Sequence, residues 1–314
     1  MGVYLSKPNT TKETHDGEND TMRFACVSMQ GWRVNMEDAH IAQLDVKPGV
    51  SVFGVFDGHG GQEVAKFCSK YFVDTLKKNA KFVEGDYAKA LTETFLQMDE
   101  LILKPEGQES LKQFKQESEA QGSYAGCTAN VCIVTNGQIF CANAGDSRAI
   151  LYTTDSNTIA LSKDHKPDVP SEKDRIHAAG GTVRDGRVND NLNLSRAIGD
   201  FEYKKNADLP PEKQMITALP DVKVHNLDVP PRLLILGCDG VWESQTGSEI
   251  SQNVWKAVED AAKKGEDKLT RAVEDLLDQL IAKDTSEGIG CDNMTSIAVV
   301  FKSSLPTGKD EKSK

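Results

Sequence analysis

The sequence predicts an α+β fold in which hairpin-connected antiparallel sheets are covered by pairs of helices. Strand-like runs occur in groups, and helical patterns occur in pairs between these groups. One group contains Asn136-Gly137 between two apolar runs, which is a strong hairpin signal. A doubly wound parallel sheet would require strands and helices to alternate, so the order of elements disfavours it.

The first half of the chain supplies three strands and two helices. Residues 23–30 and 39–46 have the pattern of short strands, and residues 52–56 form a continuous apolar run typical of a buried strand. Apolar residues at helical spacing predict helices over residues 62–79 and 86–103.

The second half continues the same grouping. We expect a short helix over residues 171–181, with Ser171 and Asp174 as a capping box, and amphipathic helices over 249–263 and 268–283. Residues 185–221 are rich in loop-forming residues. The strands expected in this half are 129–135, 138–144, 148–154, 232–238 and 295–301.

The composition argues against several classes of function. The chain has 314 residues and a formal net charge of −11. No nucleic-acid partner is expected, since general nucleic-acid binders depend on Lys and Arg contacts to phosphates. The seven cysteines lie mostly in apolar runs without paired spacing, which indicates reduced thiols of a cytosolic protein. No Cys/His cluster has zinc-site spacing, and no apolar run reaches transmembrane length.

The first 22 residues are expected to form a flexible polar leader with a lipidation signal. The opening MGVYLSKP fits the N-myristoylation pattern, with Gly2 as the acceptor and Ser6 at the required position. The alternative is a chance match, because the pattern fixes few positions. One myristoyl chain binds membranes only weakly, so we expect a cytoplasmic protein with reversible membrane association. The folded domain is expected at residues 23–301, followed by a polar tail over 302–314.

Acidic residues stand at the ends of several predicted strands. They are Glu37-Asp38, Asp57-Gly58, Asp239-Gly240 and Asp292. Taken alone, Asp57-Gly58 is a common turn signal. The repetition favours a metal site, because acidic side chains that converged without cations would repel one another and raise their own pKa values. Ligands that are all oxygen select hard cations, so Mn²⁺ or Mg²⁺ is expected.

Eight sequence blocks occur in a characteristic order. They are GWRVNMEDAH, FGVFDGHGG, GCTANV, ANAGDSRAIL, LSKDHKP, NLSRAIGD, LGCDGVWE and GCDNMT. In order and spacing, the chain resembles the metal-dependent protein phosphatase family, the type 2C serine/threonine phosphatases, over about residues 23–301. The resemblance implies a four-layer α-β-β-α sandwich, with two antiparallel β-sheets flanked by helix pairs, a binuclear metal centre at one end and a flap over about residues 165–220.

The resemblance also implies roles for individual residues. Two Mn²⁺ or Mg²⁺ ions would be bound, with a weaker third site, and Asp57 looks like the carboxylate that bridges the first two. Arg33 resembles the phosphate-binding arginine, whose planar fork suits two phosphoryl oxygens, and His59 resembles the general acid. The implied metal-site residues are Glu37, Asp38 through water, Asp57, Gly58 through its carbonyl, Asp239, Asp292 and, for the third ion, Asp146.

The activity implied by the resemblance is hydrolysis of phosphoserine and phosphothreonine in phosphorylated proteins, by in-line attack of a metal-bridging hydroxide. We expect a monomer. The alternative function is a catalytically inactive scaffold or binding module of the same fold, which the retained carboxylates disfavour. Two positions depart from the usual family pattern: Asn35, and Glu243, whose longer side chain is expected to alter third-metal binding.

Overall fold

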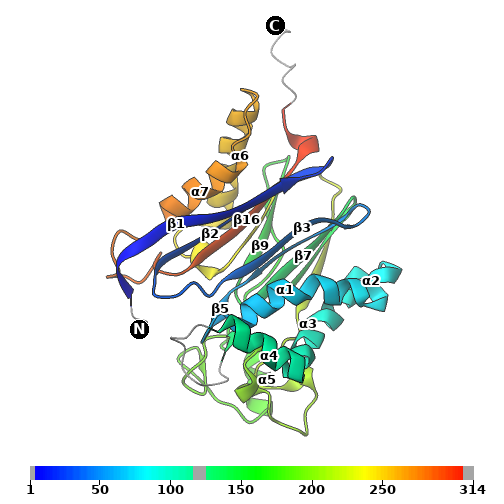
Figure 1. The fold of residues 1–314 in the computed structure, drawn as a ribbon, viewed down its shortest axis with the longest axis vertical. Coiled ribbons are helices and arrows are strands. Elements are labelled where there is room, and N and C mark those ends of the chain that lie inside the picture. The colour runs from blue at the N-terminus through cyan, green and yellow to red at the C-terminus, as the bar shows by residue number, and fades with distance from the viewer. Residues whose placement is uncertain (1–3, 116–124, 307–314) are drawn as a thin grey trace.

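Two antiparallel sheets stack face to face between two layers of helices in the computed structural model, which describes residues 4–115 and 125–306 (Figure 1). Helices α6 and α7 pack on one sheet, and α1 and α3 pack on the other. The predicted four-layer α-β-β-α sandwich is therefore confirmed.

The first sheet has six strands in the order β1-β2-β16-β15-β9-β10. Its inner strands β2, β15 and β16 are almost entirely buried, because the second sheet covers one face and α6 and α7 cover the other. The strands are β1 (Tyr4–Glu18), β2 (Met22–Arg33), β9 (Arg148–Thr153), β10 (Thr158–Ala160), β15 (Pro231–Gly237) and β16 (Met294–Phe301).

The second sheet has five strands in the order β14-β8-β7-β4-β3. Asn136 and Gly137 join β7 to β8, as their hairpin signal predicts. The edge strand β14 begins at the end of the loop-rich region, and the sequence pattern does not predict it. The bounds are β3 (Ala39–Lys47), β4 (Val50–Phe56), β7 (Ala129–Thr135), β8 (Gln138–Ala144) and β14 (Asp221–Asn226).

Strand β4 shows why its sequence is apolar without interruption. Phe53 and Val55 belong to the core between the two sheets, while Val52 and Phe56 belong to the core beneath α1 and α3. All four side chains are completely buried. A strand covered on both faces cannot place polar residues on either, so the pattern runs on until Asp57 at the end of the strand.

The four predicted amphipathic helices are confirmed as α1, α3, α6 and α7. A capping box, between Thr246 and Glu249, opens α6. The capping box predicted at Ser171 is wrong, because α5 has Val169 as its N-cap, without a side-chain cap, and Pro170 in its first turn. The helices are α1 (Glu63–Lys78), α2 (Ala80–Glu84), α3 (Tyr87–Leu103), α4 (Pro105–Phe114), α5 (Pro170–Ala178), α6 (Gly247–Ala262) and α7 (Leu269–Leu280).

Short elements at one end of the sandwich complete the fold. They form a small three-stranded sheet, in the order β13-β6-β5, and a separate two-stranded hairpin, β11-β12. Their bounds are β5 (Gly58–His59), β6 (Gly126–Cys127), β11 (Val183–Arg184), β12 (Arg187–Val188) and β13 (Ile198–Gly199). The 3₁₀ turns are η1 (Phe201–Tyr203), η2 (Pro211–Lys213), η3 (Asp239–Val241) and η4 (Lys302–Ser304).

The prediction of a flexible leader is wrong for residues 4–18, which form the edge strand β1. The strand has few apolar residues, so it shows no amphipathic pattern, but it pairs with the largely buried β2 along most of its length. A Cβ at Gly17 would lie 2.9 Å from the ring of Phe24, so glycine allows the two strands to approach there. The predicted acceptor Gly2 and the last residues of the tail, 307–314, lie outside the described residues.

All seven cysteines lie in the described part of the chain, where all are buried and none forms a disulfide, in agreement with the expectation of reduced thiols. Within residues 4–115 and 125–306, no helix combines the length and the apolar character needed to cross a bilayer.

Candidate active site

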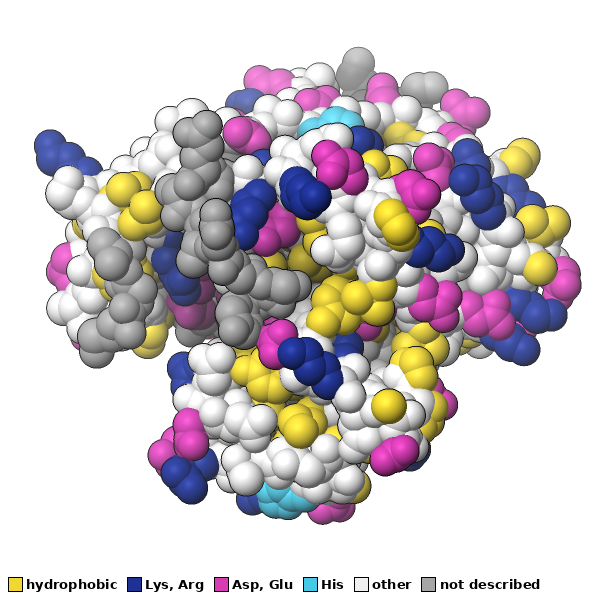
Figure 2. Space-filling model, turned by 60° about the horizontal axis from the view of Figure 1, so that its bottom comes forward, with side chains coloured by type: hydrophobic (Ala, Val, Ile, Leu, Met, Phe, Trp, Pro, Cys, Tyr) yellow, Lys and Arg dark blue, Asp and Glu magenta, His cyan; other side chains and the backbone are white. Residues whose placement is uncertain are grey.

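A cleft of about 590 Å³ opens at the end of the sandwich where the predicted acidic positions meet. Residues from both sheets and from the flap line it, including Arg33, Glu37, Asp57, Gly58, His59, Asp146, Arg187, Asp239 and Asp292. The face turned forward in Figure 2 shows Lys, Arg, Asp and Glu side chains interspersed, without a continuous basic stripe.

Asp57 lies at the centre of the acidic cluster. The Thr128 amide donates to the Asp57 carbonyl at 2.9 Å, which fixes the backbone at the end of β4. Carboxylate oxygens of Asp57, Asp146 and Asp239 lie within 4.8 Å of one another. Burial, followed by the charge of Asp239, raises the pKa of Asp57 well above its ordinary value. Burial and the charge of Asp146 raise the pKa of Asp239 to about 7.

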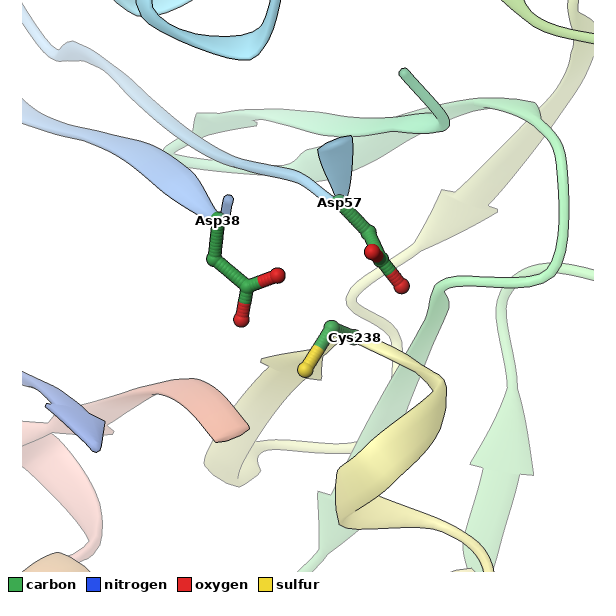
Figure 3. A group of neighbouring side chains, drawn as sticks. All are labelled: Asp38, Asp57 and Cys238. Carbon is green, nitrogen blue, oxygen red and sulfur yellow. The ribbon is translucent and has the colours of Figure 1, made fainter. Parts of the chain in front are cut away.

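Asp38 and Cys238 complete a second group around Asp57, and Figure 3 shows the three side chains converging on one space. Asp38 is 7% exposed, and neither of its carboxylate oxygens has a hydrogen-bond partner among the described residues. Burial raises the pKa of Asp38 to about 7. Burial also raises the pKa of the Cys238 thiol well above its ordinary value, so Cys238 stays protonated beside the carboxylates.

The cluster fits hard divalent cations. Its converging carboxylates repel one another, and the unpartnered oxygens of Asp38 are the kind of buried polar atoms that normally have a partner. A divalent cation would neutralise the repulsion and coordinate the oxygens directly or through water. A protonated thiol is a poor ligand for such a cation, so the oxygen donors carry this fit.

Glu37 and Gly58 approach each other on one wall of the cleft. A Cβ at residue 58 would lie 2.4 Å from the Glu37 carbonyl oxygen, so only glycine is accommodated there. The Gly61 amide donates to Glu37 Oε2 at 3.3 Å. Glu37 and Asp292 line the cleft but do not belong to either of the tight carboxylate groups.

Arg33 ends β2 at the rim of the cleft and pairs with Asp292, with 2.6 Å between Nη2 and Oδ2. Burial alone would lower the pKa of Arg33, but the charges of neighbouring groups, with Asp292 the largest contributor, together outweigh that effect and raise it. The Arg33 side chain is 43% exposed. Its guanidinium is therefore permanently charged and reachable from the cleft.

His59 makes a close pair with a residue that the sequence did not single out. Its Nε2 lies 2.7 Å from Oδ2 of Asp200, whose side chain is 2% exposed. Burial alone would lower the pKa of His59, but the charge and hydrogen bond of Asp200 outweigh it and raise the pKa. Asp200 has a positive φ of 51°, which is uncommon for a non-glycine residue. The pair lies against Gly126, where a Cβ would be 2.4 Å from Asp200 Oδ2.

Sequence reasoning also missed Lys166, which forms an ion pair with Asp146. The signal was available, since Lys166 belongs to the block LSKDHKP, but nothing in one sequence pairs it with Asp146. Glu243, expected near a third metal, accepts a hydrogen bond from the Gly290 amide at 2.6 Å and is not among the residues that line the cleft. Asn35 lines the cleft, and its carbonyl accepts a hydrogen bond from Asn293.

Comparison with known proteins identifies the chain's relatives. A family model described as protein phosphatase 2C matches residues 22–289. "Protein phosphatase 2C 1" of Paramecium tetraurelia is 52% identical over 302 residues, covering 96% of this chain and all of that protein. "Probable protein phosphatase 2C 21" of Arabidopsis thaliana is 40% identical, with 98% and 94% covered. A crystal structure of a phosphatase from Toxoplasma gondii matches with a TM-score of 0.73 and 25% identity, covering 93% of this chain and 96% of that one.

Proposed function

The chain belongs to the protein phosphatase 2C family of metal-dependent serine/threonine phosphatases, and we propose that it removes phosphate from phosphorylated proteins in the cleft described above. The observation that carries this proposal is the convergence of Asp38, Asp57, Asp146 and Asp239 next to Arg33, from separate elements of the fold. This arrangement supplies a site for cations and a permanent positive charge for a phosphoryl group.

We propose that two Mn²⁺ or Mg²⁺ ions bind, with Asp57 shared between them. Glu37 and the Gly58 carbonyl would complete the ligands of one ion, and Asp239 and Asp292 those of the other. Bound cations supply Lewis acidity that lowers the pKa of water and neutralises phosphoryl charge. The remaining acidic residues of the proposal are Asp38, which would hold water, and Asp146, which would serve a weaker third ion.

Arg33 is proposed to bind the phosphoryl group. Nη2 is occupied by Asp292 and Nε is buried, while Nη1 remains to donate to phosphoryl oxygens. The pairing with Asp292 limits the directions in which the arginine can point. Arg33 would therefore orient the substrate rather than only attract it.

His59 is proposed to protonate the seryl or threonyl oxygen as it leaves. Asp200 faces Nε2, so its carboxylate stabilises the imidazolium and fixes the orientation of the ring. An alkoxide is a poor leaving group, so a proton delivered from His59 lowers the barrier for protein substrates.

The test is phosphate release from a phosphothreonine peptide by metal-stripped protein titrated with Mn²⁺ and Mg²⁺. Activity that requires the metal and is lost in Asp57→Asn and Asp239→Asn supports the proposal. The exposed carboxylate Asp278, on α7, provides the matched control Asp278→Asn, which should stay active. Metal binding without any phosphate release would contradict it and favour the inactive scaffold.

We further propose a monomer that is N-myristoylated on Gly2 and contacts membranes reversibly from the cytoplasm. The support is the MGVYLSKP pattern together with the weak affinity of a single acyl chain. Co-expression with an N-myristoyltransferase should add the mass of one myristoyl group to the wild type and none to Gly2→Ala. An unchanged mass in the wild type would contradict the acylation proposal.

A further inference from the structure

The connection that carries Glu37 and Asp38 lacks regular structure. Strand β2 ends at Arg33 and β3 begins at Ala39, so residues 34–38 have no place in the strand ladders. The proposed metal-site residues of this segment, which begins directly after Arg33, must therefore be placed by other contacts. Two side-chain amides, those of Gln30 and Asn293, make these contacts.

The Gln30 amide holds the end that presents Arg33. Its Nε2 donates to the carbonyls of Arg33 at 2.9 Å and Val34 at 2.8 Å. Its Oε1 accepts from Asn9 Nδ2 at 3.2 Å, across the pairing of β1 with β2. Because both ends of the amide are used, its orientation is set, and the edge strand β1 contributes to setting it.

The Asn293 amide holds the end that presents Glu37. Asn293 is 6% exposed. Its Nδ2 donates to the carbonyls of Gln30 at 2.8 Å and Asn35 at 3.0 Å, and its Oδ1 accepts from the Glu37 amide at 2.9 Å. The backbone N–H of Asn293 donates to Asp292 Oδ1 at 2.7 Å. One residue therefore ties Glu37 to Asp292, from opposite ends of the sequence.

We propose that Gln30 and Asn293 are positioning residues with separate tasks. Gln30 places Arg33 for the phosphoryl group, and Asn293 places Glu37 relative to Asp292 for the cations. This inference rests on the proposed function. Its physical basis is that displacing binding and catalytic groups by a fraction of an ångström from their productive positions weakens ligand binding and slows the reaction.

The test compares the near-isosteric variants Gln30→Met and Asn293→Leu. Gln30→Met should raise KM for a phosphothreonine peptide, and the inhibition constant of inorganic phosphate, by roughly tenfold, as expected for one or two lost hydrogen bonds. Its Mn²⁺ affinity, measured by calorimetry on metal-stripped protein, should stay unchanged. Asn293→Leu should weaken Mn²⁺ binding by about tenfold, the usual scale for residues that orient metal ligands.

Gln214 offers a matched control for Asn293. Both residues are 6% exposed, and the side-chain amide of each makes three hydrogen bonds. Gln214 donates to the carbonyls of Asn206 and Leu209 and accepts from the Asn206 amide. Gln214→Met should lower Tm as the other two variants do, without changing KM or Mn²⁺ affinity. Equal changes of KM and Mn²⁺ affinity in all three variants, or no change in any, would overturn the proposal. If the wild type released no phosphate, the proposed function would fail, while Mn²⁺ calorimetry of Asn293→Leu would still decide the role of Asn293.

Discussion

The cleft and the flap each bury acidic side chains, but they treat those charges in opposite ways. In the flap, Glu172 is 2% exposed and accepts hydrogen bonds from Arg175, Arg196 and Ser195. In the acidic cluster around Asp57, the side chains of Asp38, Asp57 and Asp239 form no ion pair with a basic side chain of the described residues. The nearby Lys166 pairs instead with Asp146.

The pKa values follow this difference. Burial alone would raise the pKa of Glu172, but the two arginines outweigh it and lower the value to about 2. In the acidic cluster around Asp57, burial and neighbouring carboxylates act in the same direction and raise the pKa values of Asp38 and Asp239 to about 7. A buried acid with an arginine partner is a structural element, whereas one without a partner is suited to a ligand that brings positive charge.

Neutralising one carboxylate of the cleft should have the largest effect on activity. Asp57→Asn should lower kcat on a phosphothreonine peptide by about 10²- to 10³-fold, because it removes charge aimed at the cations. Its stability in chelator should be equal to or higher than that of the wild type, since the substitution relieves repulsion. Activity close to the wild type would mean that Asp57 is not at the reacting centre.

Neutralising the acid of the flap should have the reverse effect. Glu172→Gln leaves Arg175 without its carboxylate partner and leaves Arg196 with Asp221 alone. This loss should destabilise the protein by about 3 kcal/mol. Mn²⁺ affinity should remain that of the wild type, because Glu172 is not among the residues that line the cleft. Denaturant unfolding and calorimetry measure the two quantities. A stable variant would show that the flap cluster is not needed for the fold.

Asp200→Asn tests a third kind of buried acid, because Asp200 is paired with His59, which lines the cleft, rather than with an arginine. The variant should lose roughly ten- to a hundredfold in kcat on a phosphothreonine peptide, as protonation of the leaving oxygen is impaired. The loss should be much smaller on p-nitrophenyl phosphate, because p-nitrophenolate leaves without a proton. Equal losses on both substrates would argue against a leaving-group role for the pair.

Elements with strong local patterns were predictable from the sequence. The apolar runs of β4, β15 and β16 and the amphipathic stripes of α1, α3, α6 and α7 lie where the patterns place them. Two of the acidic strand ends were predictable for the same reason, because Asp57 and Asp239 are the first charged residues after the buried strands β4 and β15. Strand β1 was not predictable, since it depends on pairing with β2 rather than on an apolar pattern of its own.

Contacts between segments that are distant in the sequence could not be predicted either. Asp200 is 141 residues from His59, and Asn293 is 256 residues from Glu37. Both residues lie in blocks that carry the family resemblance, NLSRAIGD and GCDNMT, but nothing in the local sequence pairs them with His59 or Glu37. Their importance appears only when the folded chain brings the two segments together.

Whether the acidic cluster is the cation site can be tested by measuring the thermal stability of metal-free protein as a function of pH, with and without Mn²⁺. Asp38 and Asp239 have folded pKa values of about 7, above the unfolded value of about 4. The stability they contribute is therefore fully present below about pH 4 and is lost as pH rises through about 7. In chelator, Tm should fall over this range, and Mn²⁺ should restore it at neutral pH in the wild type but much less in Asp57→Asn. A Tm that is flat between pH 4 and 7 in chelator and unchanged by Mn²⁺ would contradict the assignment of this acidic cluster as the cation site.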